Sequence, residues 1–176
     1  MRHGSGPAGS SGRDRPLEVR PATATDREAM LGLNLESEWA LSPLDEPGLD
    51  ALVASARVAL VAEDGAGVAG FALALGPEAE YESANFRWFA ERFDSFLYLD
   101  RIAVGARSRR RGVGAAIYEV MECEAARSGR MCCEVNLVPR NAPSLAFHLS
   151  RGYEEVGTLE HPGGKVVVML VKELAR

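Results

Sequence analysis

The stretch YLDRIAVGARSRRRGVGAAI, residues 98–117, joins an apolar strand pattern to a helical pattern through a loop of arginines and glycines. Gly112 and Gly114 lack a Cβ atom, so the backbone there can approach a bulky ligand. The first N–H groups of the following helix have no intrahelical partner and carry the positive end of the helix dipole, which favours an anion. The stretch therefore predicts a site for a pyrophosphate. The alternative is a solvated basic loop whose glycines serve only the turn.

Two common phosphate-binding patterns do not describe this loop. The P-loop pattern G-x-x-x-x-G-K-S/T needs a first glycine and a lysine, which residues 109–114 do not supply. The dinucleotide fingerprint G-x-G-x-x-G needs a third glycine, which GVGAAI lacks. The loop nevertheless stands between a strand and a helix, which is the context that a phosphate site requires.

Strand and helix patterns alternate along the rest of the chain. The expected strands cover residues 17–20, 58–63, 68–75, 96–104, 131–137, 153–159 and 165–172, and the expected helices cover 26–41, 49–56, 111–127 and 141–150. This mixture of hairpins and crossovers predicts an α/β fold, a sheet with helices on both faces. Residues 1–16 are rich in glycine, serine and proline and are expected to form a flexible tail, which leaves residues 17–176 as a single domain.

The amino-acid composition argues against several classes of function. The 176 residues carry 20 basic and 25 acidic side chains, and this acidic balance argues against a dedicated nucleic-acid binder. No stretch approaches the ~18 apolar residues of a membrane span, so no membrane partner is expected. Three cysteines without a C-x-x-C spacing suggest small core residues in a reducing, cytoplasmic compartment. The three histidines show no paired spacing, so no metal is expected.

Two motifs carry a resemblance to a known family. Arg109-x-x-Gly112-x-Gly114 after a strand resembles the R/Q-x-x-G-x-G/A signature of the GCN5-related N-acetyltransferase (GNAT) superfamily. NAPSLAFHLSRGY, residues 141–153, resembles that family's N-x-x-A-x-x-F/L-Y-x-x-x-G-F/Y element. The order of the elements extends the likeness over about residues 17–172. Residues 81–104 also resemble a bacterial subgroup of predicted acetyltransferases.

The resemblance implies a mixed, mostly antiparallel central sheet that contains a splayed pair of parallel strands. It also implies an acyltransferase that moves an acetyl group directly from acetyl-CoA to a primary amine of a small molecule or peptide. No covalent enzyme intermediate is expected, because no cysteine occupies a motif position. By the same resemblance, the residues expected to bind the cosubstrate are Ile102, Ala103, Val104, Arg109, Arg110, Arg111, Gly112, Val113, Gly114, Ala115, Asn136, Asn141, Pro143 and Ser144.

Two residues are expected at the chemical step. His148 stands where many members of the family carry a tyrosine that protonates the leaving thiolate, and an imidazolium could donate that proton. The alternative is a neutral, hydrogen-bonded histidine without a catalytic part. Asp100 lies inside a buried strand and is expected to position or deprotonate the amine, with a salt bridge to an arginine as the alternative. Strand alternation places Asp100 on one face with Tyr98, Ile102 and Val104.

The acceptor is expected to lie beside residues 77–100, which by resemblance flank its entrance. This segment holds seven of the chain's aromatic residues and six acids against two bases. Phe86, Phe89 and Phe93 have helical spacing and are expected to pack inward. An acidic rim would attract a cationic amine. The residues expected to contact the acceptor are Tyr81, Glu82, Trp88 and Tyr98.

Two other functions compete with this interpretation. A histidine in place of the usual tyrosine is compatible with a non-catalytic module that binds or senses acyl-CoA. The arginine loop could contact nucleic acid, although the net charge of −5 opposes that function. A homodimer is compatible with the sequence, which does not define the oligomeric state.

Overall fold

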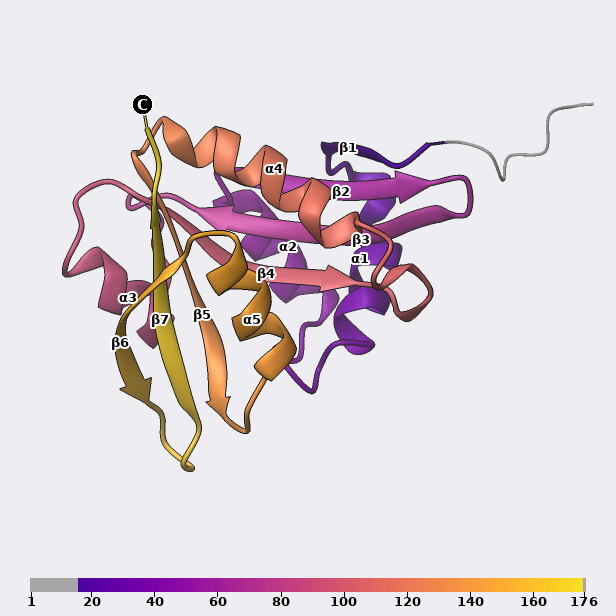
Figure 1. Cartoon of the computed structure of the whole chain (residues 1–176). Coiled ribbons are helices and arrows are strands. Elements are labelled where there is room, and N and C mark those ends of the chain that lie inside the picture. Colours follow the sequence, from indigo (N-terminus) through magenta and orange to yellow (C-terminus); the bar gives the residue numbers. More distant parts are fainter. Residues whose placement is uncertain (1–15, 176) are drawn as a thin grey trace, which may run out of the picture.

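The computed structural model describes residues 16–175, so residues 1–15 of the expected tail lie outside the described residues (Figure 1). Within this range the chain forms a seven-stranded sheet in the order β1-β2-β3-β4-β5-β7-β6. The strands are β1 (Glu18–Pro21), β2 (Val58–Asp64), β3 (Gly67–Leu75), β4 (Leu97–Val104), β5 (Arg130–Val138), β6 (Glu154–Glu160) and β7 (Val166–Glu173). The helices are α1 (Arg27–Leu35), α2 (Glu46–Ser55), α3 (Ala84–Ala90), α4 (Val113–Ala126) and α5 (Ala142–Ser150), with short 3-10 turns η2 (Ala24–Asp26) and η3 (Ala106–Ser108).

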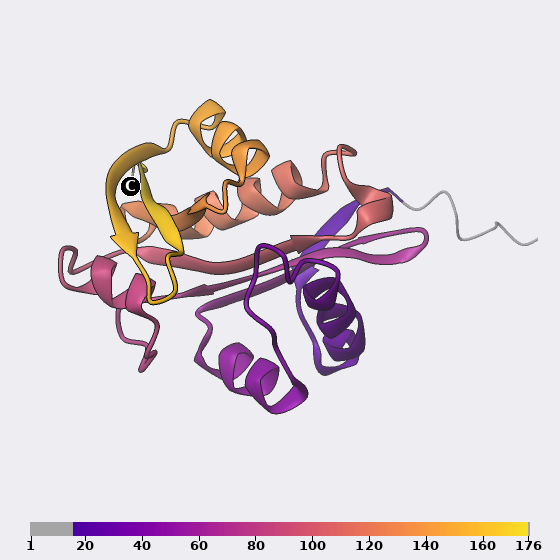
Figure 2. The same ribbon diagram turned by 90° about the horizontal axis from the view of Figure 1, so that it is seen from below.

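Helices cover both faces of the sheet, which confirms the predicted α/β architecture. Figure 2 shows α4 and α5 on one side of the sheet and α1 and α2 on the other. On the first side, Ile117 and Met121 of α4 are fully buried against apolar residues of the central strands. On the second side, Met30 of α1 and Phe89 of α3 belong to a separate buried cluster. Each face of the sheet therefore has its own hydrophobic core.

The centre of the sheet opens where β4 meets β5. Within the described residues this is the parallel pair, and its register holds only Leu97 opposite Met131 and Tyr98 opposite Cys132. Beyond these residues the two strands run apart, as Figure 1 shows. The other neighbours are antiparallel. The expected mostly antiparallel sheet with one splayed parallel pair is thus confirmed.

A β-bulge at Asp100 overturns the alternation expected along β4. Leu99 pairs with Ala74 of β3, but Arg101 pairs with Leu73, so Asp100 is an extra residue in the ladder. An extra residue reverses which face the following side chains occupy. Tyr98 therefore packs in the α1–α3 core, whereas Ile102 packs against the α4 core. The expectation that Tyr98 and Ile102 share one face is wrong.

The first helix is shorter than expected, and the residues that follow it contact the central strand β4 instead. The helix predicted over residues 26–41 ends at Leu35, and the chain then turns back. Asn34 Nδ2 and Arg101 Nη1 both donate to the carbonyl oxygen of Ser42, each at 3.2 Å. These two hydrogen bonds hold residues 40–42 over the opening between β4 and β5. The second helix begins at Glu46, earlier than expected, because the Asp45 side chain accepts the Gly48 N–H at 2.8 Å.

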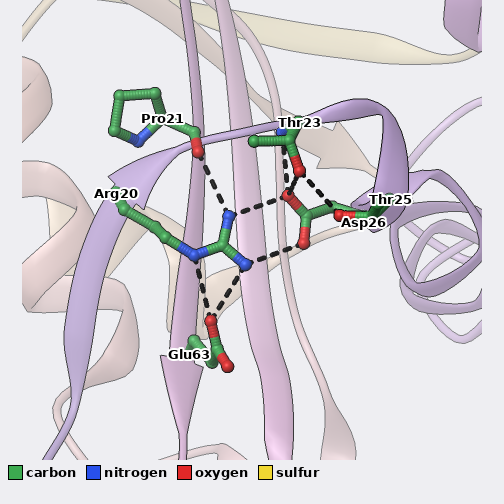
Figure 3. Close-up of polar contacts among 6 residues, drawn as sticks. All are labelled: Arg20, Pro21, Thr23, Thr25, Asp26 and Glu63. Atoms are coloured by element: carbon green, nitrogen blue, oxygen red, sulfur yellow. Dashed lines mark hydrogen bonds and ion pairs between the residues drawn. The ribbon is translucent and has the colours of Figure 1, made fainter.

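A cluster of charges fixes the edge of the sheet to the start of α1 (Figure 3). Arg20 of β1 donates to both carboxylate oxygens of Asp26 at 2.8 Å and to Glu63 of β2 at 3.0 Å. Asp26 also accepts the Thr23 backbone N–H at 2.8 Å, which closes the turn before α1. The hydrogen bonds from Arg20 hold the pKa of Asp26 well below its usual range, although burial opposes this. The cluster is therefore structural.

Candidate active site

A cavity of ≈ 170 Å³ occupies the opening between β4 and β5. Its wall comes from seven parts of the fold. The lining residues are Ala40, Leu41 and Ser42 before α2; Tyr81, Ser83 and Asn85 at α3; Tyr98, Leu99, Asp100, Arg101 and Ile102 of β4; Tyr118 of α4; Cys133, Glu134, Val135 and Asn136 of β5; Asn141, Ser144 and His148 of α5; and Lys165 before β7. The divergence of two central strands thus brings polar groups into the middle of the sheet.

Glu134 of β5 lines this cavity and is partly exposed. Its Oε1 accepts from Asn85 Nδ2 at 2.7 Å, and its Oε2 accepts from the Tyr98 hydroxyl at 2.9 Å. The Asn85 oxygen in turn lies 2.8 Å from His161 Nε2. Burial and the negative charge of Asp100 raise the pKa of Glu134 to about 7. A carboxylate with such a pKa can take a proton near neutral pH.

Sequence analysis did not identify Glu134. The signal that could have found it is an acid inside the apolar strand MCCEVNLV, residues 131–138. Asp100 was selected on the same physical ground, the cost of burying an unpaired carboxylate. The two carboxylates face the same cavity from diverging strands, an arrangement that depends on the pairing of β4 with β5.

Asp100 reaches the cavity as expected, but both of its oxygens are engaged. The Tyr81 hydroxyl donates to Oδ1 at 2.7 Å, and Arg101 Nε donates to Oδ2 at 3.0 Å. The side chains of Asp100 and Arg101 are 6% and 8% exposed. Arg101 is itself held by Asn34 Oδ1 at 2.8 Å. The salt bridge considered as an alternative is therefore present, and it joins neighbours along the strand.

His148 also lines the cavity, and its imidazole is in the neutral form. Its Nδ1 lies 2.7 Å from the Ser144 carbonyl oxygen, which can only accept, so Nδ1 carries the hydrogen. Nε2 is then an acceptor and receives the Tyr118 hydroxyl in a close contact. Burial lowers the pKa of His148, so the charged form is disfavoured. This geometry does not favour the expected imidazolium acid and brings in Tyr118, which sequence analysis did not select.

The glycine-rich loop forms an open surface at the start of α4. Gly112 caps the helix with φ +84°, and Arg110 also takes a positive φ of 59°. A Cβ atom placed on Gly114 would have, among the described residues, one heavy atom within 4 Å, Val104 Cγ2 at 3.9 Å. The backbone N–H groups of Val113, Gly114 and Ala115 lie in the first turn of this 14-residue helix, so they suit an anion.

The arginines around this loop divide into two groups. Arg107 donates to the carbonyl oxygens of Ala66 and Val68, each at 3.2 Å, and so braces the β2–β3 hairpin. Arg109, Arg110 and Arg111 are exposed around the start of α4. These three guanidinium groups are placed to add positive charge to the helix N-terminus.

The start of α5 flanks the other side of the cavity. Asn141 caps the helix, since its Oδ1 accepts the Ser144 N–H at 3.2 Å, and Pro143 lies in the first turn. The Asn141 N–H donates to the Asn136 carbonyl oxygen at 2.9 Å. Asn136, Asn141 and Ser144 all line the cavity. The N-cap role of Asn141 is compatible with the expected contact to the cosubstrate.

The residues expected to contact the acceptor separate into two pairs. Tyr81 and Tyr98 line the cavity, where their hydroxyls donate to Asp100 and Glu134. Trp88 packs instead against β6, where a Cβ atom on Gly157 would come within 2.7 Å of its ring. Glu82 is exposed outside the cavity wall. Lys165, which was not predicted, adds a positive charge to the wall.

Within residues 16–175, no cluster of three or more histidine, cysteine, aspartate or glutamate side chains could hold a metal ion. No helix in that range is both long and apolar enough to cross a membrane.

The fold is similar to that of solved N-acetyltransferases. The ribosomal-protein-S18-alanine N-acetyltransferase from Escherichia coli aligns with a TM-score of 0.69 at 16% identity, over 92% of this chain and 96% of that chain. The ribosomal-protein-alanine N-acetyltransferase from Brucella melitensis aligns with a TM-score of 0.70 at 23% identity, over 89% and 99%. A GCN5-related N-acetyltransferase from Kribbella flavida aligns with a TM-score of 0.68 at 22% identity, over 90% and 98%.

No curated protein sequence matches the chain. The model of the acetyltransferase (GNAT) family, however, matches residues 26–153, which run from the start of α1 to the end of the α5 motif. This range contains β4, the glycine loop, β5 and α5, and hence most of the cavity wall. The chain therefore belongs to the GNAT family of acetyltransferases.

Proposed function

We propose that this protein transfers an acetyl group directly from acetyl-CoA to a primary amine of a small molecule or peptide. The observation that carries the proposal is the divergence of β4 and β5 beside the glycine N-terminus of α4. Beyond Tyr98, β4 has no ladder partner on β5, so its backbone there can pair with an extended chain, which would share the Val104 carbonyl with Arg109 Nε, 3.3 Å away. The pantetheine arm of acetyl-CoA fits this role. The pyrophosphate of the cosubstrate would then lie on the first N–H groups of α4 and on Arg109–Arg111.

Glu134 is the group best suited to prepare the amine. A typical alkyl ammonium has a pKa of ~10 and cannot attack until it loses a proton. A carboxylate whose pKa is about 7 is a stronger base than an ordinary glutamate, and Asn85 and Tyr98 hold it in one orientation. Asp100 faces the same cavity, where it forms a buried ion pair with Arg101. The free amine then attacks the thioester carbonyl carbon, and the C–S bond breaks from the tetrahedral adduct.

The test is release of free CoA thiol from acetyl-CoA in the presence of single amines: L-lysine, spermidine, tyramine and a peptide with a free N-terminus. The wild-type protein is expected to release thiol with at least one amine. Glu134→Gln is expected to lower kcat by about 10²–10⁴-fold. Glu155→Gln, an exposed change on β6, is the matched control and should keep wild-type kcat. Binding of acetyl-CoA without turnover on any amine would favour the acyl-CoA-binding module instead.

A further inference from the structure

Two side chains and one backbone carbonyl on α4 and α5 form a hydrogen-bonded chain that ends at the cavity. The Ser144 carbonyl accepts Nδ1–H of His148, and Nε2 of His148 accepts the hydroxyl hydrogen of Tyr118. Tyr118 is 2% exposed and His148 4%, yet both line the cavity. Because the Tyr118 hydroxyl uses its hydrogen on the imidazole, the lone pairs of its oxygen remain free to accept another hydrogen bond. The arrangement resembles a hydroxyl prepared by a base that a third group orients.

The partners of the cavity tyrosines distinguish Tyr118 from the other two. Among the described residues, the cavity wall contains Tyr81, Tyr98 and Tyr118. The hydroxyls of Tyr81 and Tyr98 donate to carboxylates, to Asp100 at 2.7 Å and to Glu134 at 2.9 Å. The hydroxyls of Tyr81 and Tyr98 therefore hold these carboxylates in position. Tyr118 instead faces a neutral base that can accept a proton and return it.

We infer that Tyr118, backed by His148, carries a proton from the attacking nitrogen to the departing sulfur of acetyl-CoA. This inference rests on the proposed acetyl transfer. Attack by the free amine forms a C–N bond and leaves a positive charge on nitrogen, while the thiolate leaves with the C–S electron pair. The nitrogen must therefore lose one proton and the sulfur must gain one.

The Tyr118–His148 pair can make this exchange without another reactant. The Tyr118 oxygen takes the proton from nitrogen as its own hydrogen passes to Nε2 of His148. The resulting imidazolium keeps its Nδ1–H on the Ser144 carbonyl oxygen, 2.7 Å away. Nε2 then returns its proton to the Tyr118 oxygen, which gives its other proton to the sulfur. Tyr118 and His148 end as they began.

The packing of α4 on α5 holds the pair in place. The Tyr118 ring lies edge-on to Phe147, with centroids 5.1 Å apart, and edge-on to His148, at 5.3 Å. One turn further along α4, Glu122 accepts from Arg151 at the end of α5, at 3.0 Å. Two helices that are far apart in sequence are thereby fixed face to face, which keeps the hydroxyl against the imidazole.

The experiment compares variants in the thiol-release assay, with the amine that the wild-type protein uses fastest. Tyr118→Phe keeps the ring packing and removes the hydroxyl, so kcat is expected to fall by about 10²–10⁴-fold. The KM for the amine and the Kd for acetyl-CoA should stay within about twofold, because a group that acts only after binding leaves affinity unchanged. Tyr118→Phe combined with His148→Tyr places a phenol on α5, and kcat should partly recover.

A second variant separates proton transfer from packing. His148→Gln offers an oxygen to the Tyr118 hydroxyl but cannot take up its proton, so kcat should fall while KM is unchanged. Wild-type kcat in Tyr118→Phe would overturn the inference, and if that variant does not fold, wild-type kcat in His148→Gln would do so. Loss of activity in Glu134→Gln with full activity in Tyr118→Phe refutes only the relay. Absence of wild-type turnover on every amine refutes the proposed function itself.

Discussion

Replacing Glu134 by glutamine should change how the stability of the protein depends on pH. In the folded protein burial and the charge of Asp100 raise the pKa of Glu134 from 4.5 to about 7. The folded protein therefore holds this proton at pH values where the unfolded chain has lost it. The resulting stabilisation is fully present below about pH 4.5, declines as the pH rises, and is lost above about pH 7.

The magnitude follows from the two pKa values. Their difference corresponds to about 3 kcal/mol, and solvent in the cavity reduces this to about 2 kcal/mol. Glutamine has nearly the same shape. Its oxygen can accept from Asn85, and its amide can donate to the Tyr98 oxygen, since a hydroxyl also accepts. Glu134→Gln should therefore match the wild-type protein at pH 5 and exceed its free energy of unfolding by about 2 kcal/mol at pH 8.

The assay is urea unfolding of the wild-type protein and of Glu134→Gln at pH values from 5 to 8, with Glu155→Gln as the exposed control. The difference between the two free energies of unfolding isolates position 134, because the other titrating groups are common to both proteins. Parallel curves would refute the reasoning, since they would mean that this carboxylate has an ordinary pKa. A difference that also appears in Glu155→Gln would assign the effect to net charge.

Three further predictions test other parts of the structure. Gly114→Leu should abolish the stabilisation of about 2.7 kcal/mol expected from acetyl-CoA at 100 times its Kd, whereas Gly114→Ala should keep it; equal thermal shifts in both would place the cosubstrate elsewhere. Arg20→Ala should lower the free energy of unfolding by about 2 kcal/mol at pH 7 and by less at pH 3, because at pH 3 the Asp26 carboxyl takes up a proton in the unfolded chain but not in the folded wild-type protein, where Arg20 keeps its pKa low. Urea unfolding at both pH values checks this, and an equal loss at both would contradict it. Trp88→Ala should lower the melting temperature, because the ring packs on Gly157, but should leave kcat unchanged; a fall in kcat would return Trp88 to the acceptor site.

Most elements of the fold could be predicted from local patterns. Apolar alternation and turn residues located the strands to within a residue or two, as for β3 (Gly67–Leu75), which was expected over 68–75. Helix α3 (Ala84–Ala90) was not among the expected helices, although the helical spacing of Phe86 and Phe89 indicated it, and the first helix was expected to reach residue 41 but ends at Leu35. Propensity could not reveal that end, because hydrogen bonds to the Ser42 carbonyl from Asn34 and from the distant Arg101 stabilise the turn that follows.

The family and the position of the arginine-glycine loop were determined by the sequence itself, because both depend on residues close together in the chain. Gly112 has its positive φ and its place at the start of α4 for local reasons. Asn141 is likewise an N-cap through a contact three residues away.

Only the tertiary structure decided which groups face one another in the cavity. The bulge at Asp100 arises from its register with β3, and Glu134 meets Tyr98 because β5 pairs with β4 across 36 residues of sequence. Tyr118 and His148 come from different helices, 30 residues apart. A side chain's partner and its pKa depend on such distant contacts, which no local pattern encodes. The chain's own pattern therefore specified an acetyltransferase scaffold, and the packing of its strands and helices brought Glu134, Tyr118 and His148 to one cavity.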